Sequence, residues 1–201
     1  IALETGAIDM QATIDVSKPI RVAGQLIDDY HPIKGSIGLA EILVRSSNIG
    51  SAHISQLIGS ETQKNYMKQL GLLSASPLEI VENGVPLVPQ NWSHITTMTV
   101  SYGYGLSVSM VQAAAAIAAA GGDGHYIAPT LLRRNANEPI EKLRIFSTET
   151  SMAVRSMMRL VVSNKIGTGN FADAPGYLVG GKTGTAEIGR GQTPSAPQSA
   201  G

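Results

Sequence analysis

The sequence predicts an α+β fold that is rich in helices and contains only short hairpins and one longer strand. Several segments combine a Ser at the start with apolar residues at helical spacing, which is typical of capped amphipathic helices. An apolar run from Tyr177 to Gly181 is instead typical of a buried strand. With 43% hydrophobic but only 4% aromatic residues, aliphatic side chains and Ala must fill the core.

The first half of the chain begins with residues 1–5, which read as the end of a helix stopped by Gly6. Residues 7–18 resemble a loop. Two short apolar segments, 19–23 and 25–28, flank Gly24 and predict a hairpin. Helices are expected over residues 36–44, 49–58 and 60–71, with Ser36 as the cap of the first and a Ser60–Gln63 capping box on the last.

The second half contains a Pro-rich loop, 74–90, and then a short helix that starts at Asn91 or Ser93. Ser109 caps a helix over Met110–Ala120 that is apolar on all sides, so we expect it to be buried on all sides and to pack against residues 36–58. Two weak strands, 126–132 and 139–146, are expected to pair. Ser147 caps a helix to Val162, and a loop follows from 164 to 176.

Composition excludes several function classes. The formal net charge is zero, which gives no reason to expect a nucleic-acid partner. No cysteine is present, so disulfides and thiolate chemistry are excluded. No apolar run reaches the 18–20 or so residues of a membrane span. The four histidines are scattered without an i,i+4 pair, so we expect no metal and no other cofactor.

The stretch Lys182–Glu187, sequence KTGTAE, follows the predicted strand and carries the first candidate site. Lys182 supplies a cation, and Thr183 and Thr185 point to one face of a strand because side chains alternate. A cation, two hydroxyls and the bare backbone of Gly184 can together receive a carboxylate or an oxyanion. The alternative interpretation is an edge strand with a solvated lysine.

A second candidate site is the turn that contains Ser46 and Asn48, between two predicted helices. Ser and Asn favour such breaks because their side chains bond nearby backbone groups, so a capping turn is the simplest interpretation. Ser-x-Asn followed much later by Lys-Thr-Gly is, however, a pair of motifs found in penicillin-binding proteins and serine β-lactamases.

Longer segments make this resemblance more specific. Asn91-Trp92, the segment Met98–Ser109 and the Gly167–Gly169 turn all resemble class B penicillin-binding proteins. The resemblance extends from Ile1 to about Gly189 and looks closest to the septal cell-division D,D-transpeptidase branch. It implies the transpeptidase and serine β-lactamase-like fold, with the Lys-Thr-Gly strand as the one strand of the main sheet in this chain.

The resemblance also implies a part that this chain does not carry. The family's nucleophile lies in Ser-x-x-Lys, and no such tetrapeptide precedes Ser46. We therefore expect this motif just before Ile1, and further strands beyond residue 201. Residues 1–188 then form a partial transpeptidase domain, and the Gly-, Gln-, Ser- and Pro-rich residues 189–201 form a disordered tail.

Roles for the site residues follow from the resemblance. Ser46 would relay a proton, Asn48 would hydrogen-bond the base lysine and the substrate amide, and Lys182 would provide positive potential. The Thr183 and Thr185 hydroxyls, beside Gly184, would bind the substrate carboxylate. Implied partners are peptidoglycan stem peptides, β-lactams and division membrane proteins. The implied location is the periplasmic face of the bacterial inner membrane, with the anchor outside this chain.

Two alternatives remain open from the sequence. The first is a serine β-lactamase or D,D-carboxypeptidase, which share both motifs, although the Met98–Ser109 segment argues against it. The second is a non-catalytic division scaffold. A parent sequence that reads Ser-x-x-Lys before Ile1 would favour the enzyme over the scaffold.

The missing motif gives a first prediction. The isolated 201-residue chain should not be labelled by a fluorescent penicillin, because the serine that attacks the β-lactam ring is not in it. Denaturing gel electrophoresis after incubation would measure the labelling. Stoichiometric covalent fluorescence would contradict the prediction.

Overall fold

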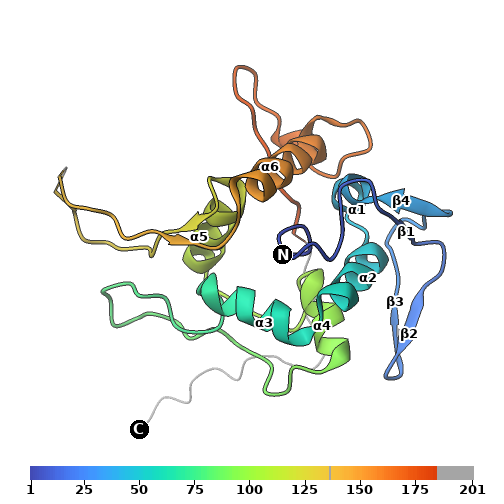
Figure 1. Ribbon diagram of the computed structural model, residues 1–201, viewed down its shortest axis with the longest axis horizontal. Coiled ribbons are helices and arrows are strands. Elements are labelled where there is room, and N and C mark those ends of the chain that lie inside the picture. The colour runs from blue at the N-terminus through green and yellow to red at the C-terminus, as the bar shows by residue number, and fades with distance from the viewer. Residues whose placement is uncertain (136, 185–201) are drawn as a thin grey trace, which may run out of the picture.

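The computed structural model describes residues 1–135 and 137–184, and its helices form a ring around the first turn of the chain (Figure 1). Short strands lie on the outside of the ring, in agreement with the predicted α+β fold. The elements are β1 Thr13–Asp15, β2 Ile20–Val22, β3 Gln25–Ile27, β4 Ser36–Gly38, α1 Leu39–Arg45, α2 Asn48–Ile58, α3 Ser60–Gln69, α4 His94–Ser101, α5 Met110–Gly121, β5 His125–Tyr126, β6 Leu143–Arg144, α6 Thr148–Ser163 and the 3₁₀-helix η1 Asn170–Ala172.

The chain starts with a single helical turn that ends at Gly6, as the sequence predicts. The N–H of Gly6 donates to Leu3 O and that of Ala7 donates to Ala2 O, which is the paired bonding of a Schellman motif. Gly6 has φ of 68°, a left-handed conformation that glycine adopts without a steric penalty. The predicted helix end is therefore confirmed.

The hairpin around Gly24 is also confirmed. β2 and β3 pair antiparallel, with Ile20 opposite Ile27, and Ala23 and Gly24 form the two-residue turn between them. Both turn residues have positive φ, at 48° and 76°, which matches the twist of tight antiparallel hairpins. The later pairing is much shorter than predicted, because only His125–Tyr126 and Leu143–Arg144 form a ladder.

Serine side chains cap most of the helices that the sequence predicts. Ser47, Ser93, Ser109 and Ser147 each accept a backbone N–H from the first turn of α2, α4, α5 and α6 respectively. At α5 the cap is a full capping box with Gln112. A cap of this kind stabilises a helix by about 1 kcal/mol.

Three predicted details in the first half are wrong. Ser36 does not cap a helix, because it pairs with Asp15 in β4, and β1 lies in the segment predicted to be a loop. The helix therefore begins after Gly38 without a side-chain cap. Ser60 and Gln63 form no capping box either, because the buried Gln63 amide instead bonds Thr97 O and the indole N–H of Trp92.

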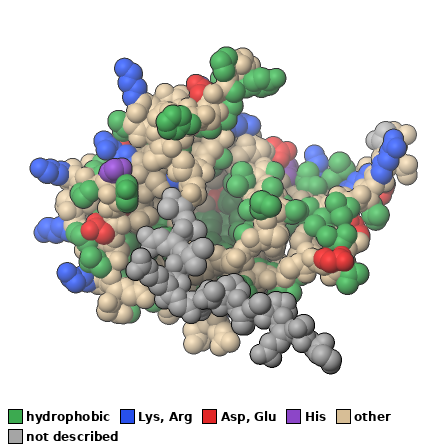
Figure 2. Space-filling model, turned by 180° about the vertical axis from the view of Figure 1, so that it is seen from behind, with side chains coloured by type: hydrophobic (Ala, Val, Ile, Leu, Met, Phe, Trp, Pro, Cys, Tyr) green, Lys and Arg blue, Asp and Glu red, His purple; other side chains and the backbone are tan. Residues whose placement is uncertain are grey.

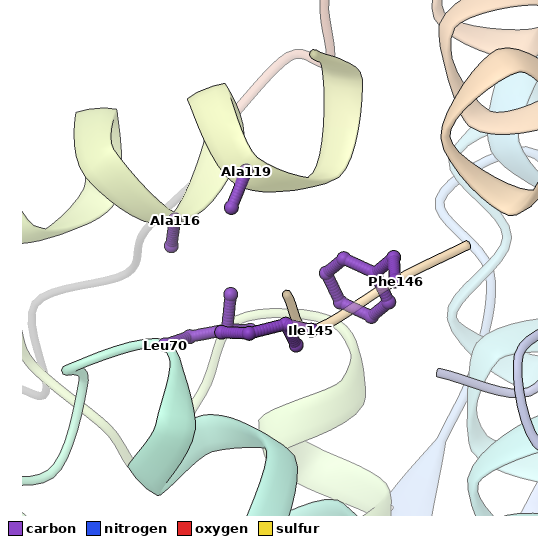
Figure 3. Packing of buried hydrophobic residues seen from close by; sticks show 5 residues of the cluster. All are labelled: Leu70, Ala116, Ala119, Ile145 and Phe146. Atoms are coloured by element: carbon purple, nitrogen blue, oxygen red, sulfur yellow. The ribbon is translucent and has the colours of Figure 1, made fainter. Parts of the chain in front are cut away.

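The buried core is divided among the ring helices. One cluster, shown in Figure 3, places Ala116 and Ala119 of α5 against Leu70, Ile145 and Phe146. A second cluster contains Ile42 and Ile49, and a third contains Ala52 and Met98. α6 packs against both α1 and α5, and α2 packs against α4.

This arrangement contradicts the expectation that α5 packs against residues 36–58. α6 lies between α5 and α1 and packs against both (Figure 1). α5 is also not buried on all sides, because Met110 and Ile117 are 90% and 56% exposed. Its buried face is the small-residue face around Ala116 and Ala119, which permits the close contact with Ile145 and Phe146.

The connection between β5 and β6 projects away from the ring (Figure 1). It exposes a group of aliphatic side chains, visible on the right of Figure 2, which comprises Ile127, Leu131, Leu132, Ile140 and Leu143. Within the described residues, no helix is both long enough and apolar enough to cross a membrane.

The segment from Tyr177 to Gly184 does not form the buried strand that the sequence predicts. Tyr177 and Leu178 are 76% and 92% exposed, and residues 177–184 belong to no β-ladder. The segment instead contacts α6, where Gly181 N–H donates to Met158 O at 3.1 Å. The rest of the Lys-Thr-Gly stretch, residues 185–187, lies outside the described part of the chain.

A cavity of about 330 Å³ lies inside the ring. Aliphatic side chains from the first turn, α1, α2 and α6 form most of its wall, including those of Ile1, Leu43, Ile54 and Met157. The first turn of the chain therefore borders a space that is suited to apolar side chains.

The contact between α1 and α2 gives a prediction about stability. A Cβ on Gly50 would lie 2.7–2.9 Å from three side-chain carbons of the buried Ile42, whose β-branched side chain has little freedom to move. Gly50→Ala should therefore destabilise the fold by about 1–3 kcal/mol through overpacking, despite the better helix propensity of Ala.

Urea denaturation of purified protein would measure this loss. Gly84→Ala is the matched control, because a Cβ there meets no atom within 4 Å and the backbone has no positive φ. An unchanged or raised midpoint for Gly50→Ala would contradict the predicted overpacking.

Candidate active site

The turn between α1 and α2 presents Ser46 in an unusual backbone conformation. Ser46 has φ of 58° and ψ of 45°, the left-handed region that non-glycine residues enter at a cost of about 1–2 kcal/mol. The bonds around it, Ser46 N–H to Leu43 O and Ser47 N–H to Ile42 O, repeat the pattern that ends the first turn at Gly6. A serine here occupies a position that favours glycine, which is typical of functional sites.

A buried carboxylate accepts two hydrogen bonds from this turn and the start of α2. Asp29 is 8% exposed, and its Oδ2 accepts the Ser47 hydroxyl at 2.7 Å while its Oδ1 accepts the Ile49 N–H at 3.0 Å. Ser47 Oγ also accepts the Gly50 N–H as the cap of α2. The negative charge lies at the N-terminus of α2, where the helix dipole stabilises it.

Asn48 begins α2, and its side chain bonds the same neighbouring segment. Its Nδ2 donates to Asp28 O at 3.0 Å. This bond uses the amide nitrogen and directs the carbonyl oxygen of the side chain elsewhere. The segment 28–29, which follows β3, thus accepts hydrogen bonds from Ser47, Asn48 and Ile49.

Lys182 joins the two motifs. Its Nζ donates to Ser46 Oγ at 2.8 Å, and also to the backbone and hydroxyl oxygens of Thr183 at 3.1 and 3.2 Å. Desolvation by burial lowers the pKa of the Lys182 ammonium from its ordinary value of 10.5. No carboxylate of the described residues forms a salt bridge with it, so the cation is available to an anion from outside.

Thr168 connects the same group to α1. Its N–H donates to Val44 O at 3.3 Å, and its hydroxyl lies 2.9 Å from the Thr183 hydroxyl. Thr168 belongs to the loop that follows α6, and Asn170 holds this loop by donating to Val162 O and Asn164 O. The end of α1, the loop after α6 and the Lys182 segment therefore meet at one place.

The predicted site residues have different outcomes. Ser46, Lys182 and Thr183 lie together, and Asn48 lies on the same turn as Ser46. The segment is a capping turn, as the simplest interpretation expects, because Ser46 is the C-cap of α1 and Ser47 is the N-cap of α2. The Ser46 hydroxyl takes no part in the capping and instead accepts from Lys182. Gly184 is exposed and Thr185 lies outside the described residues.

Sequence reasoning missed Asp29 and did not count Thr168 as a site residue. Asp29 follows the predicted hairpin, where an acidic residue reads as an ordinary turn residue, and no spacing signal relates it to Ser47. Thr168 lies in the Gly167–Gly169 turn that supported the resemblance, so its sequence context was a usable signal. Among the described residues, no group of three or more metal-ligating side chains gathers.

This arrangement can perform two chemical tasks. The partly desolvated Lys182 ammonium and the neighbouring Thr183 hydroxyl can receive a carboxylate by charge-assisted hydrogen bonds. The Ser46 hydroxyl accepts from Lys182 and can donate its own proton onward, as a proton relay requires.

A comparison with protein families identifies the class of domain to which this fold belongs. The model of the penicillin-binding protein transpeptidase domain matches residues 1–200, so the chain belongs to this family.

Individual relatives are of the same kind. The chain is 34% identical over 188 residues to the probable peptidoglycan D,D-transpeptidase FtsI of Caulobacter vibrioides, covering 93% of this chain and 32% of that protein. It is 32% identical to the probable peptidoglycan D,D-transpeptidase PenA of Neisseria meningitidis serogroup A, covering 92% of this chain and 31% of that protein.

A solved structure has the same fold. The transpeptidase domain of penicillin-binding protein 3 from Burkholderia pseudomallei superposes with a TM-score of 0.86 at 32% identity, covering 94% of this chain and 58% of that one. The chain thus spans about a third of the length of these curated relatives. The predicted transpeptidase-like α+β fold class is confirmed.

The role of Asp29 can be tested by substitution. Asp29→Ala should destabilise the protein by about 1–3 kcal/mol for each orphaned donor, because the Ser47 hydroxyl and the Ile49 N–H lose their acceptor in a buried place. Thermal or urea unfolding would measure this loss.

Asp28→Ala is the matched control. The Asp28 carboxylate is exposed and only accepts the Asp29 N–H, while its backbone carbonyl, which receives Asn48, survives the substitution. Equal losses for the two variants would mean that the buried carboxylate has no special role in holding the turn.

Proposed function

We propose that the protein containing this chain is a peptidoglycan D,D-transpeptidase that cross-links stem peptides and is acylated by penicillin. The observation that carries the proposal is the 2.8 Å contact between Lys182 Nζ and Ser46 Oγ, which joins two motifs 136 residues apart. The family match and the names of the relatives support the same activity.

In this proposal the nucleophile is a serine of a Ser-x-x-Lys segment that precedes Ile1 and continues into the first turn. The cavity beside Ile1 supports this placement, because its apolar wall would suit a helix entering the centre of the ring. The serine attacks the carbonyl of the penultimate D-Ala, and the lysine of the same motif takes its proton.

Ser46 then carries a proton between that lysine and the amine that leaves. Asn48 is the second contact of the lysine, through the side-chain oxygen that its bond to Asp28 leaves available. An amino group of a second stem peptide attacks the acyl-enzyme and completes the cross-link. Each proton that Ser46 receives is passed on, so its hydroxyl is unchanged after one cycle.

Lys182 and Thr183 bind the terminal carboxylate of the stem peptide, and a β-lactam presents its own carboxylate to the same groups. Burial lowers the pKa of Lys182, so its ammonium loses its proton more readily as the pH rises. The attraction for the carboxylate should therefore be lost at a lower pH than it would be with a fully solvated lysine. Thr185 contributes its hydroxyl, and its N–H forms half of the oxyanion hole. Loss of one oxyanion donor typically costs about 3–4 kcal/mol of transition-state stabilisation.

Location and partners follow from this assignment. The relatives are named as probable peptidoglycan transpeptidases, and peptidoglycan lies outside the inner membrane. We propose that the protein acts at the periplasmic face of the membrane during septation, together with membrane proteins of cell division.

Penicillin kinetics separate this function from its two alternatives. A transpeptidase should remain acylated for many minutes, whereas a β-lactamase would hydrolyse the acyl-enzyme rapidly. A non-catalytic scaffold would not be labelled. Stopped-flow acylation followed by mass spectrometry of the full-length protein would distinguish all three.

The contribution of Lys182 gives a specific prediction for the full-length protein. Lys182→Ala should slow acylation by penicillin and by a stem-peptide substrate about 10- to 100-fold, because both lose a charge-assisted contact. Lys182→Arg should also slow both, since a planar guanidinium does not reproduce the compact ammonium.

Lys182→Ala should lose activity without losing stability toward unfolding. The lowered pKa means that the fold disfavours the charged form of Lys182, so removing the charge at neutral pH should not lower the unfolding midpoint. Lys64→Ala, at an exposed position on α3, is the control. Acylation at the wild-type rate in either Lys182 variant would refute the assigned role.

A further inference from the structure

The first turn of the chain is tied to α6 by a carboxylate that the proposed mechanism does not use. Glu4 Oε2 accepts both the N–H and the hydroxyl of Ser147, each at 2.9 Å, across 143 residues of sequence. Ser147 is the N-cap of α6, so the carboxylate lies at the positive end of the helix dipole. Hydrogen bonds to an ionised acceptor in such a place are stronger than neutral ones.

The ionisation of Glu4 agrees with this geometry. Burial by itself would raise the pKa of the Glu4 carboxyl, but the hydrogen bonds from Thr150 and Ser147 outweigh it and lower the pKa below 4.5. A carboxyl with a lowered pKa stabilises the fold at neutral pH, and this contribution is lost as the pH falls through that pKa. The lowered pKa favours the carboxylate form, which makes the bonds from Ser147 charge-assisted.

Glu4 and apolar packing hold the first turn of the chain from different sides. Glu4 lies two residues before Gly6, at the last helical position of the Schellman motif. Ala2 is buried, and Ile1 packs against the cluster of Leu70 and Phe146. The turn is thus held on one side by apolar packing and on the other by the Glu4 carboxylate.

The segment before Lys182 is hydrogen-bonded to α6. Met158 O accepts the Gly181 N–H at 3.1 Å, and the Arg159 guanidinium donates to Val179 O at 2.8 Å. A Cβ on Gly180 would lie 3.1 Å from Arg159 N, so this backbone lies directly on the helix. One rigid helix therefore connects the first turn of the chain with the Lys-Thr-Gly segment.

We infer that Glu4 is a positioning residue for acylation, which sets the first turn relative to Lys182 through α6. The inference rests on the proposed function, in which the nucleophile belongs to the helix that ends in this turn. A shift of the turn would move the attacking serine while leaving Ser46, Lys182 and Thr183 in place. The consequence is a slower chemical step with unchanged capture of the carboxylate.

The test is the acylation of full-length protein by a chromogenic cephalosporin, with the limiting rate constant and the half-saturating concentration measured separately. Glu4→Ala should lower the limiting rate constant by about tenfold, because small misplacements of reacting groups cost that much or more. The half-saturating concentration should stay within about twofold, since the carboxylate receptor is intact. Glu4→Gln keeps an acceptor oxygen for Ser147 and should lose less.

Glu149→Ala is the matched control, because Glu149 lies in the first turn of the same helix, is exposed and makes no hydrogen bond to the first turn of the chain within the described residues. It should acylate at the wild-type rate. A Glu4→Ala protein with a reduced amplitude but a wild-type rate constant would overturn the inference and show a merely structural role. A wild-type protein that is never acylated would instead overturn the proposed function.

Discussion

The buried carboxylate of Asp29 is the interaction on which the site depends. It lies beneath the turn between α1 and α2 and accepts one hydroxyl and one backbone N–H from it. Without such an acceptor, the first turn of α2 would leave donors unpaired inside the protein, and the left-handed backbone of Ser46 would have less to oppose its strain. The position of the Ser46 hydroxyl beside Lys182 thus depends on Asp29, although Asp29 forms no hydrogen bond with Lys182 in the described structure.

A second constraint is the placement of α6 between the two halves of the ring. It packs against α1 and against α5. Its polar groups bind segments that are distant in sequence, at Glu4 near one end and at Val179 along the middle. The loop after it returns to α1 through Thr168 and Val44. Helix packing and the geometry of the site are therefore parts of one arrangement.

Local signals explain which features could be predicted from the sequence. Helix starts at Ser109 and Ser147, the turn at Gly24 and the stop at Gly6 each depend on a residue whose own chemistry determines the nearby backbone. The pairing of the Ser46 and Lys182 motifs was accessible because both motifs are recognisable as residue patterns.

Features that depend on distant partners were not accessible in this way. Ser36 has the chemistry of a cap but pairs with Asp15, and Gln63 has the chemistry of a capping box but bonds Thr97 and Trp92. The stretch Tyr177–Gly181 has strand-like residues, yet strand formation needs a neighbouring strand, and the described residues provide only the surface of α6. Asp29 was overlooked for the same reason, since its importance comes from the fold around it.

The hairpin that projects from β5 and β6 has a further consequence for the dynamics of the molecule. A ladder of two residue pairs and the Ile145 and Phe146 N–H bonds to Gly124 O hold its base. The described residues of the long connection have no ladder partner, although Glu79 accepts from Thr130 and Leu131. Backbone amides of residues 127–135 and 137–142, apart from that of Leu131, should therefore exchange with deuterium much faster than those of α6, because exchange there requires only local opening. The same segment should be the first place where a protease cleaves the native protein, and the helical ring would remain assembled after that single cut.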